Sequence, residues 1–296
     1  GLGNIWKFPY IAGQNGGGAF VLVYLICVVL IGMPVMMSEI LIGRRGRRNP
    51  VATMALLGKE EGSSQHWKWV GGIGVLAGIL ILSYYSVIAG WVLAYVVKSA
   101  SGTFSGASSE VVSAVFAEFT GSWQAVALTH TIFMGLTVLV VARGVERGLE
   151  QAVRFMVPAL LILMLTLLGY AISSGYFMQG VEFMFTPSWD KLGWDSVLAA
   201  LGQAFFTLSI GMGAVMAYGA YLPADTSITG ASAAVVAADT GIAILAGLVI
   251  FPLVFANGLS PADGPGLVFQ TLPLAFGKMA GGVIFSTVFF VLLSFA

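Results

Sequence analysis

Thr207-Leu-Ser-Ile-Gly-Met-Gly213 interrupts an uncharged, mostly apolar stretch, residues 196–224, that is long enough to cross a bilayer. Two glycines around one side chain weaken a helix, each by about 1 kcal/mol relative to alanine. A break in mid-membrane exposes backbone N–H and C=O groups that lipid cannot satisfy, so it survives only where it lines a cavity or holds a ligand. The break therefore predicts a binding site near the membrane midplane, as in transporters.

The composition predicts a polytopic helical membrane protein. The chain is 58% hydrophobic and 9% charged, with a mean hydropathy of +0.95, whereas soluble domains carry roughly 25% charged residues. The net charge is zero and basic tracts with interleaved aromatic residues are absent, which argues against a nucleic-acid partner. The single cysteine, Cys27, permits no intrachain disulfide.

Apolar runs of about 20 residues locate the expected membrane spans. They predict a partial first helix over residues 1–13, a turn at 15–18, full spans over 19–43, 70–97, 125–142, 148–172, 195–221 and 230–256, and an eighth starting near Gly281. The span 195–221 is the broken one. We expect residues 1–296 to be a single transmembrane transporter domain, lacking the N-terminal half of helix 1 and everything after early helix 8.

Basic residues predict the orientation of these spans. Nine of the thirteen Lys and Arg lie on one side, between spans two and three or between spans four and five: Arg44, Arg45, Arg47, Arg48, Lys59, Lys68, Arg143, Arg147 and Arg154. The positive-inside rule makes this side cytoplasmic. We therefore expect an integral protein of a bacterial-type inner (plasma) membrane, with the N-terminal side in the cytoplasm.

A second glycine-interrupted segment lies in the first span. Gly1-Leu-Gly-Asn-Ile-Trp-Lys-Phe-Pro-Tyr10 again puts two glycines around one apolar residue. Interrupted spans at corresponding positions of two halves point to the binding site of an inverted-repeat transporter. The alternative interpretation is that these glycines have no binding role and only allow close packing of helices.

These strings resemble the signatures of the neurotransmitter:sodium symporter family. The first-helix signature matches residues 3–10 and 15–20, and the sixth-helix signature matches Gln203-Ala-Phe-Phe-Thr-Leu-Ser209, while Ser83-Tyr-Tyr85 suits the third helix. The resemblance covers the whole chain. It implies an all-α polytopic protein with the LeuT-type inverted-repeat fold, from the second half of helix 1 to the start of helix 8, and sodium-coupled uptake of amino acids.

The expected substrate site combines backbone and side chains. The N–H groups of Gly1, Leu2 and Gly3 lie at the N-terminal end of a half-helix, which attracts a carboxylate. By resemblance, Tyr85 binds the same carboxylate. The side-chain pocket is expected to be lined by Ile81, Phe206, Ser209 and Met212. Because an apolar lining penalises polar groups that find no partner, we predict large hydrophobic or aromatic substrates.

Three oxygen-bearing side chains suggest a cation site. Asn4, Thr207 and Asp239 offer hard ligands without sulfur or imidazole, which suits an alkali or alkaline-earth ion. The resemblance implies that they form the first sodium site next to the substrate carboxylate, and that the carbonyl of Ala296 belongs to the second. Each residue alone could equally be an ordinary polar group satisfied between helices. Sodium is the only cofactor expected, without an organic one.

Asp239 departs from the family pattern, because most relatives have asparagine there. Chloride-dependent members bind the anion with groups matching Tyr24, Gln203 and Thr207, and with a serine where this chain has Ala243. A carboxylate inside a membrane span is costly enough to indicate function. We predict that Asp239 replaces the chloride, so that chloride is not required, while proton antiport stays open.

Four residues are expected to serve gating. By resemblance, Lys7 belongs to the outer gate and Phe206 closes the pocket from outside, while Gly148 and Pro158 let the fifth helix unwind toward the cytoplasm. Glu39, in the second span, is expected to be structural and hydrogen-bonded to neighbouring backbone.

Two other classes remain as alternatives. A transporter of the same fold could use another small amine or amino-acid substrate with different ion coupling. An ion channel is less favoured, because channels need a continuous pore lined by rings of carbonyls or charges. An enzyme is not expected, since the sequence suggests neither a His/Cys metal cluster nor a nucleophile paired with a base.

Overall fold

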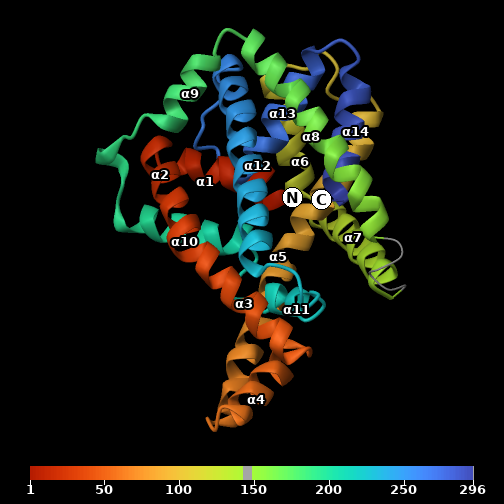
Figure 1. Cartoon of the computed structure of the whole chain (residues 1–296). Helices are drawn as coiled ribbons and strands as arrows, with labels where there is room; N and C mark the ends of the chain where they lie inside the picture. The colour runs from red at the N-terminus through yellow and green to blue at the C-terminus, as the bar shows by residue number, and fades with distance from the viewer. Residues whose placement is uncertain (143–148, 296) are drawn as a thin grey trace. The chain divides into compact units, whose positions relative to one another are not determined.

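A computed structural model gives the fold and describes residues 1–142 and 149–295, of which 149–153 are described by their backbone alone (Figure 1). Every regular element in these residues is a helix. Five helical stretches are long and apolar enough to cross a membrane: Gly18–Gly46, Gln65–Ala100, Trp123–Ala142, Arg154–Ser173 and Ile228–Ala256. They confirm the unbroken full spans expected from hydropathy.

The first two spans differ from plain α-helices. The first consists of a π-helix, η1 (Gly3–Lys7), followed by α1 (Phe8–Gln14), and the turn after it has Gly16 and Gly17 at φ +83° and +76°. The second contains α2 (Gly18–Cys27), a π-helical turn η2 (Val28–Gly32) and α3 (Met33–Gly46). Such wide turns often mark functional segments of a helix, and the sequence did not predict them.

The remaining elements follow the predicted order. The spans are α5 (Lys68–Ala100), α7 (Trp123–Ala142), α8 (Leu149–Ser173), the broken pair α10 (Trp194–Thr207) and α11 (Ala214–Gly219), α12 (Ile228–Ala256) and α14 (Gly282–Phe295). The connections contain α4 (Pro50–Glu60), η3 (Gln65–Trp67), α6 (Ser109–Gly121), α9 (Phe177–Phe185), η4 (Trp189–Lys191), η5 (Gly264–Gly266) and α13 (Leu267–Lys278). The last two are the short helical pieces expected within 257–279.

The chain forms two compact units. Unit 1 comprises Gly1–Ala19, Tyr84–Lys191 and Ile242–Ala296, and unit 2 comprises Phe20–Ser83 and Leu192–Gly241. Both units are built from segments far apart in sequence, and α2, α5 and α12 each contribute to both. The expectation of a single transporter domain stays a prediction.

Unit 1 has a core rich in aromatic rings. Tyr95 of α5 packs against Phe104, Phe269 and Phe290, with ring centroids 5.3, 5.1 and 5.3 Å away. All four side chains are buried. Aromatic pairs at these distances are favourable beyond the area they bury, so the pairs of Tyr95 with Phe269 and Phe290 tie α5 to α13 and α14.

Unit 2 is held together by close helix contacts at glycines. A Cβ on Gly43 of α3 would overlap the carbonyl oxygen of Met216, and one on Gly219 of α11 would lie 2.6 Å from the carbonyl oxygen of Ile40. The short helix α11 therefore lies directly on the backbone of α3, as Figure 1 also shows. Small residues at helix contacts are the usual packing device in membranes.

Candidate functional site

The predicted break is present in unit 2. Helix α10 ends at Thr207, α11 begins at Ala214, and Ser209, Gly211 and Gly213 have φ of +54°, +82° and +77°. The N–H of Ile210 donates to the carbonyl of Phe205 at 3.1 Å, which closes α10 in a Schellman-type end. Ser209 occupies the left-handed position usually taken by glycine, at a cost of about 1 kcal/mol.

A carboxylate from α3 satisfies a backbone group of the break. Oε1 of Glu39 accepts the N–H of Gly211 at 2.6 Å, and the backbone N–H of Met216 lies near the same carboxylate. Met216 lies in the first turn of α11, where N–H groups have no acceptor within the helix. Glu39 is only 9% exposed. It thus holds the break from a neighbouring helix, which confirms the expected bond to backbone.

The break also faces a strip of α5 that has no side chains. A Cβ on Gly74 would lie 3.2 Å from the carbonyl oxygen of Gly211, and one on Gly78 would lie 3.9 Å from that of Met212. Ile81 follows Gly78 by three residues, so it shares this face of α5. Sequence reasoning missed both glycines, although their spacing of four is a known signal for close helix approach.

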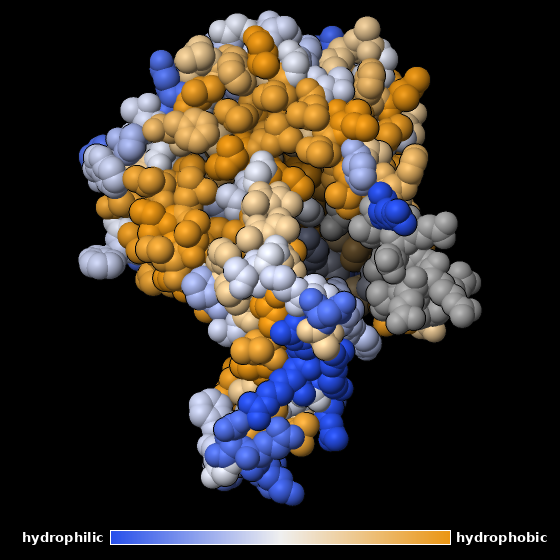
Figure 2. All heavy atoms as spheres, in the orientation of Figure 1, coloured by the Kyte–Doolittle hydropathy of each residue, from blue (hydrophilic) through white to orange (hydrophobic). Residues whose placement is uncertain are grey.

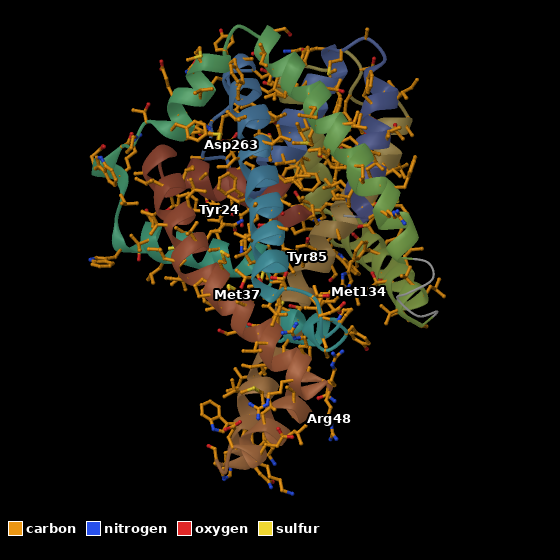
Figure 3. All side chains as sticks on the ribbon, in the orientation of Figure 1. Tyr24, Met37, Arg48, Tyr85, Met134 and Asp263 are labelled. Atoms are coloured by element: carbon orange, nitrogen blue, oxygen red, sulfur yellow. The ribbon has the colours of Figure 1, made fainter. Side chains whose placement is uncertain are left out.

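Polar side chains from three helices meet beside the end of α10. The hydroxyl of Thr207 donates to Oδ2 of Asp239 at 2.8 Å, and the phenol of Tyr24 lies next to Asp239, Thr207 and Thr240 (Tyr24 is labelled in Figure 3). Gln203 lies one turn before Thr207 and is buried. The structure therefore brings together Tyr24, Thr207 and Asp239 as predicted, and adds Thr240, which sequence reasoning missed.

The hydroxyl oxygen of Thr207 keeps lone pairs that can bind a cation. A threonine hydroxyl carries one proton and two lone pairs. Because the proton is donated to Asp239, the lone pairs point away from the carboxylate. An oxygen held in this way, next to a carboxylate, is a suitable ligand for a hard cation such as sodium.

Unit 1 contains the other half of the predicted site. The N–H groups of Asn4 and Ile5 each donate to the carbonyl of Gly1 at 3.1 Å, so Gly1, Leu2 and Gly3 lie in the first turn of a helix, as expected. The hydroxyl of Tyr85 lies beside the backbone of Leu2. Tyr85 lies on α5 (Figure 3). The two groups expected to receive the substrate carboxylate are thus adjacent.

The composite site drawn from both halves stays a prediction. Gly1, Leu2, Gly3, Asn4, Lys7 and Tyr85 belong to unit 1, whereas Tyr24, Ile81, Gln203, Phe206, Thr207, Ser209, Met212 and Asp239 belong to unit 2. Among the gating residues, Pro158 lies inside α8 and is exposed. Gly148 and Ala296 lie outside the described residues.

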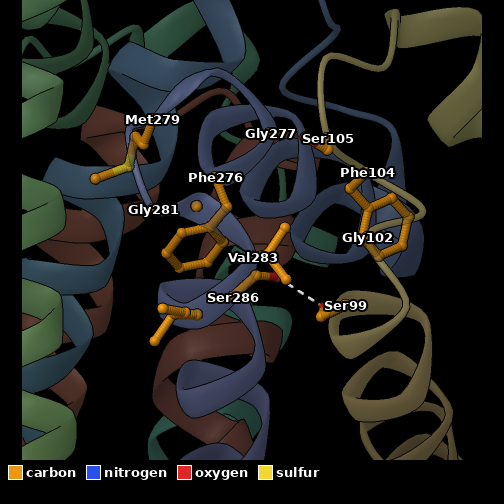
Figure 4. Close-up of a pocket in the computed structure, with 12 residues that line it drawn as sticks. Ser99, Gly102, Phe104, Ser105, Phe276, Gly277, Met279, Gly281, Val283 and Ser286 are labelled. Atoms are coloured by element: carbon orange, nitrogen blue, oxygen red, sulfur yellow. Dashed lines mark hydrogen bonds between the residues drawn. The ribbon is translucent and has the colours of Figure 1, made fainter.

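A cavity of about 240 Å³ in unit 1 contains none of the predicted site residues (Figure 4). It lies where α5 ends and α14 begins, and the buried hydroxyls of Ser99 and Ser286 bond to each other at 2.7 Å beside it. A smaller cavity of about 110 Å³ is lined by Gly1 and otherwise by apolar side chains, among them Ile5, Leu160 and Met164. Neither cavity offers the polar chemistry gathered around Thr207.

Comparison of the chain with known proteins finds sodium-dependent transporters. The profile of the sodium:neurotransmitter symporter family matches residues 1–115 and 117–296. An uncharacterized sodium-dependent transporter of Bacillus subtilis is 42% identical over the whole chain, and one of Methanocaldococcus jannaschii is 31% identical. The sodium-dependent neutral amino acid transporter B(0)AT2 of Bos taurus is 29% identical over 85% of the chain.

The fold has a close counterpart among solved structures. The crystal structure of MhsT in complex with L-phenylalanine matches the whole chain with a TM-score of 0.94 and 42% identity. The chain spans 66% of the MhsT chain, and 65% and 62% of the Bacillus and Methanocaldococcus proteins.

Proposed function

Because the chain belongs to the sodium:neurotransmitter symporter family, we propose that the protein takes up amino acids together with sodium by alternating access. The observation that carries this proposal is the break between α10 and α11. Gly211 and Gly213 adopt left-handed backbone there, and Glu39 accepts the N–H of Gly211. A break in a spanning helix exposes backbone N–H and C=O groups that lipid cannot satisfy, so it persists only where it lines a cavity or holds a ligand. We place it in a bacterial-type inner membrane with its N-terminal side in the cytoplasm, following the basic residues.

The substrate is a large hydrophobic or aromatic amino acid. The proposed side-chain pocket, Ile81, Phe206, Ser209 and Met212, offers mainly apolar surface, and a thioether such as that of Met212 adapts to aromatic rings. The relatives support this class, since MhsT was crystallised with L-phenylalanine and B(0)AT2 is named as a neutral amino acid transporter. The common part of the substrate, its carboxylate, goes to the N–H groups of Gly1–Gly3 and to Tyr85.

Sodium binds with the substrate, through Asn4, Thr207 and Asp239. The bond between Thr207 and Asp239 supports this role, because it orients one ligand and keeps a negative charge beside it. Asp239 also lies next to Tyr24, one of the groups matching the chloride position. A fixed carboxylate there supplies the charge of an anion permanently, so transport does not need chloride.

Binding of labelled amino acids to the protein in liposomes tests the proposal. We expect saturable binding of phenylalanine and leucine that needs sodium, persists when chloride is replaced by gluconate, and is lost in Tyr85→Phe and Asn4→Ala. Tyr84→Phe, on the adjacent residue, is the matched control and should bind normally. Binding without sodium would favour a transporter of the same fold with different coupling, and a sodium current without amino-acid binding would favour a channel.

A further inference from the structure

The connection between α3 and α5 is the most strongly basic surface in unit 2. We call residues 44–69 the basic foot; it contains the end of α3, α4, η3 and the first two residues of α5. The basic foot contains six basic residues and two acidic ones, Glu60 and Glu61. Figure 2 shows hydrophilic residues gathered over this part of the molecule.

Half of the basic residues already have partners within the foot or close to it. Arg44 donates to the carbonyl of Thr226 at 2.7 Å, and Arg47 donates to that of Ala220 at 3.0 Å. Arg45 pairs with Glu60 and Glu61 at 3.5 and 2.6 Å. These contacts involve both acidic side chains of the foot and three of its guanidinium groups.

Three basic side chains are left for an outside partner. Arg48, Lys59 and Lys68 are exposed, and within the described residues they form no ion pair. Arg48 lies at the junction of α3 and α4 (Figure 3). Long cationic side chains kept in water without an anion are available to bind one.

The packing of the foot sets where these charges lie. Gly58 of α4 lies against the ring of Trp67, with a virtual Cβ 3.3 Å from Cδ1, and Gly71 of α5 lies against the carbonyl of Pro50. The start of α5 is therefore antiparallel to α4. Lys59 and Lys68 share one end of this hairpin, and Arg48 lies toward the other, where α5 continues into the membrane.

Exposed aromatic and aliphatic side chains continue directly from the charges. Trp67 and Trp69 are 48% and 62% exposed on either side of Lys68, whose ammonium lies 5.6 Å from the centre of the Trp69 ring. Val70 and Ile73 follow on α5 and are also exposed. Indole rings on either side of a cation, followed by exposed aliphatic side chains, are typical of a membrane–water interface.

We propose that the basic foot binds the headgroups of anionic phospholipids through Arg48, Lys59 and Lys68, with Trp67 and Trp69 contacting the lipid beside Lys68. A basic cluster next to a spanning helix attracts anionic lipid by charge, with an effect that grows with each Lys or Arg near the surface. The exposed rings favour a lipid over a free phosphate or a nucleic acid, because those offer no apolar layer beneath the charge.

Lipid titration of the purified protein tests this, with bound lipids counted by native mass spectrometry. The probes are phosphatidylglycerol and phosphatidylcholine, which share acyl chains and differ in charge. We expect wild type to prefer phosphatidylglycerol. The triple variant Arg48→Gln, Lys59→Gln, Lys68→Gln should lose this preference, by roughly fivefold for each residue. The variant Lys98→Gln, Lys191→Gln, Lys278→Gln removes three charges from unit 1 and should keep it.

A second variant changes the preference in the other direction. Glu60→Gln with Glu61→Gln frees Arg45 and removes two negative charges, so phosphatidylglycerol should bind more tightly. Three outcomes would each overturn the proposal. Wild type could bind both lipids equally, the triple variant with Arg48→Gln could keep the preference of wild type, or free glycerol phosphate could bind as tightly as the lipid. The measurement contains neither sodium nor amino acid, so its outcome is independent of the proposed transport.

Discussion

The bond between Glu39 and Gly211 gives the sharpest test of how the break is held. Glu39→Gln keeps the size of the side chain but leaves only a neutral amide oxygen to accept the N–H of Gly211. Hydrogen bonds to a charged acceptor contribute about 1.5–3 kcal/mol, against about 0.5–1.5 kcal/mol for a neutral pair. Replacing the charged acceptor with a neutral one therefore removes about 1.4 kcal/mol from the local stability of the break.

Hydrogen–deuterium exchange of peptides covering residues 208–217 measures this local stability. Because 1.4 kcal/mol corresponds to a factor of ten, the amide of Gly211 should exchange roughly tenfold faster in Glu39→Gln. Glu61→Gln, on an exposed carboxylate of the same unit, is the control and should leave these peptides unchanged. Unchanged protection of the Gly211 amide in Glu39→Gln would refute the role of Glu39 in holding the break.

Three further predictions concern unit 2. Gly43→Ala should lower the Tm of the protein by several degrees, since its Cβ overlaps the Met216 carbonyl and overpacking costs about 1–3 kcal/mol; Gly72→Ala, where a Cβ meets open space, should not. Arg44→Ala should destabilise by about 1–2 kcal/mol through its lost bond to the Thr226 carbonyl, as measured by thermal unfolding, with a smaller loss in Arg44→Lys. Thr207→Val should raise the sodium concentration for half-maximal amino-acid binding by roughly tenfold or more, because a bond worth about 1.5–3 kcal/mol is lost, and Thr207→Ser should restore it.

The sequence was most informative where one local property decides the structure. Hydropathy located the spans because a lipid environment requires about 20 apolar residues in a row. Gly211 and Gly213 located the break because only glycine adopts their left-handed backbone without strain. The pairing of Thr207 with Asp239 came from family resemblance, since neither residue type alone distinguishes a ligand from a packed polar group.

Other features of unit 2 could not be predicted in this way. The bonds from Arg44 and Arg47 end on backbone carbonyls, which every residue has, so their acceptors carry no signature in the sequence. Ser209 in a left-handed conformation runs against its own preference and is imposed by the end of α10. The position of the Met216 N–H near Glu39 depends on how α11 lies on α3, a tertiary property.

The arginines at the end of α3 also bear on how the protein is made. Arg44 is synthesised 182 residues before Thr226, the residue whose carbonyl it finally binds. In the proposed orientation, a positive charge beside an early span resists translocation and contributes to the topology of that span before the later ones are made. The same side chain later binds the segment between α11 and α12. Arg44 therefore contributes both to the proposed topology and to tertiary assembly, and a substitution that neutralises it removes one of six basic charges and a native contact at once.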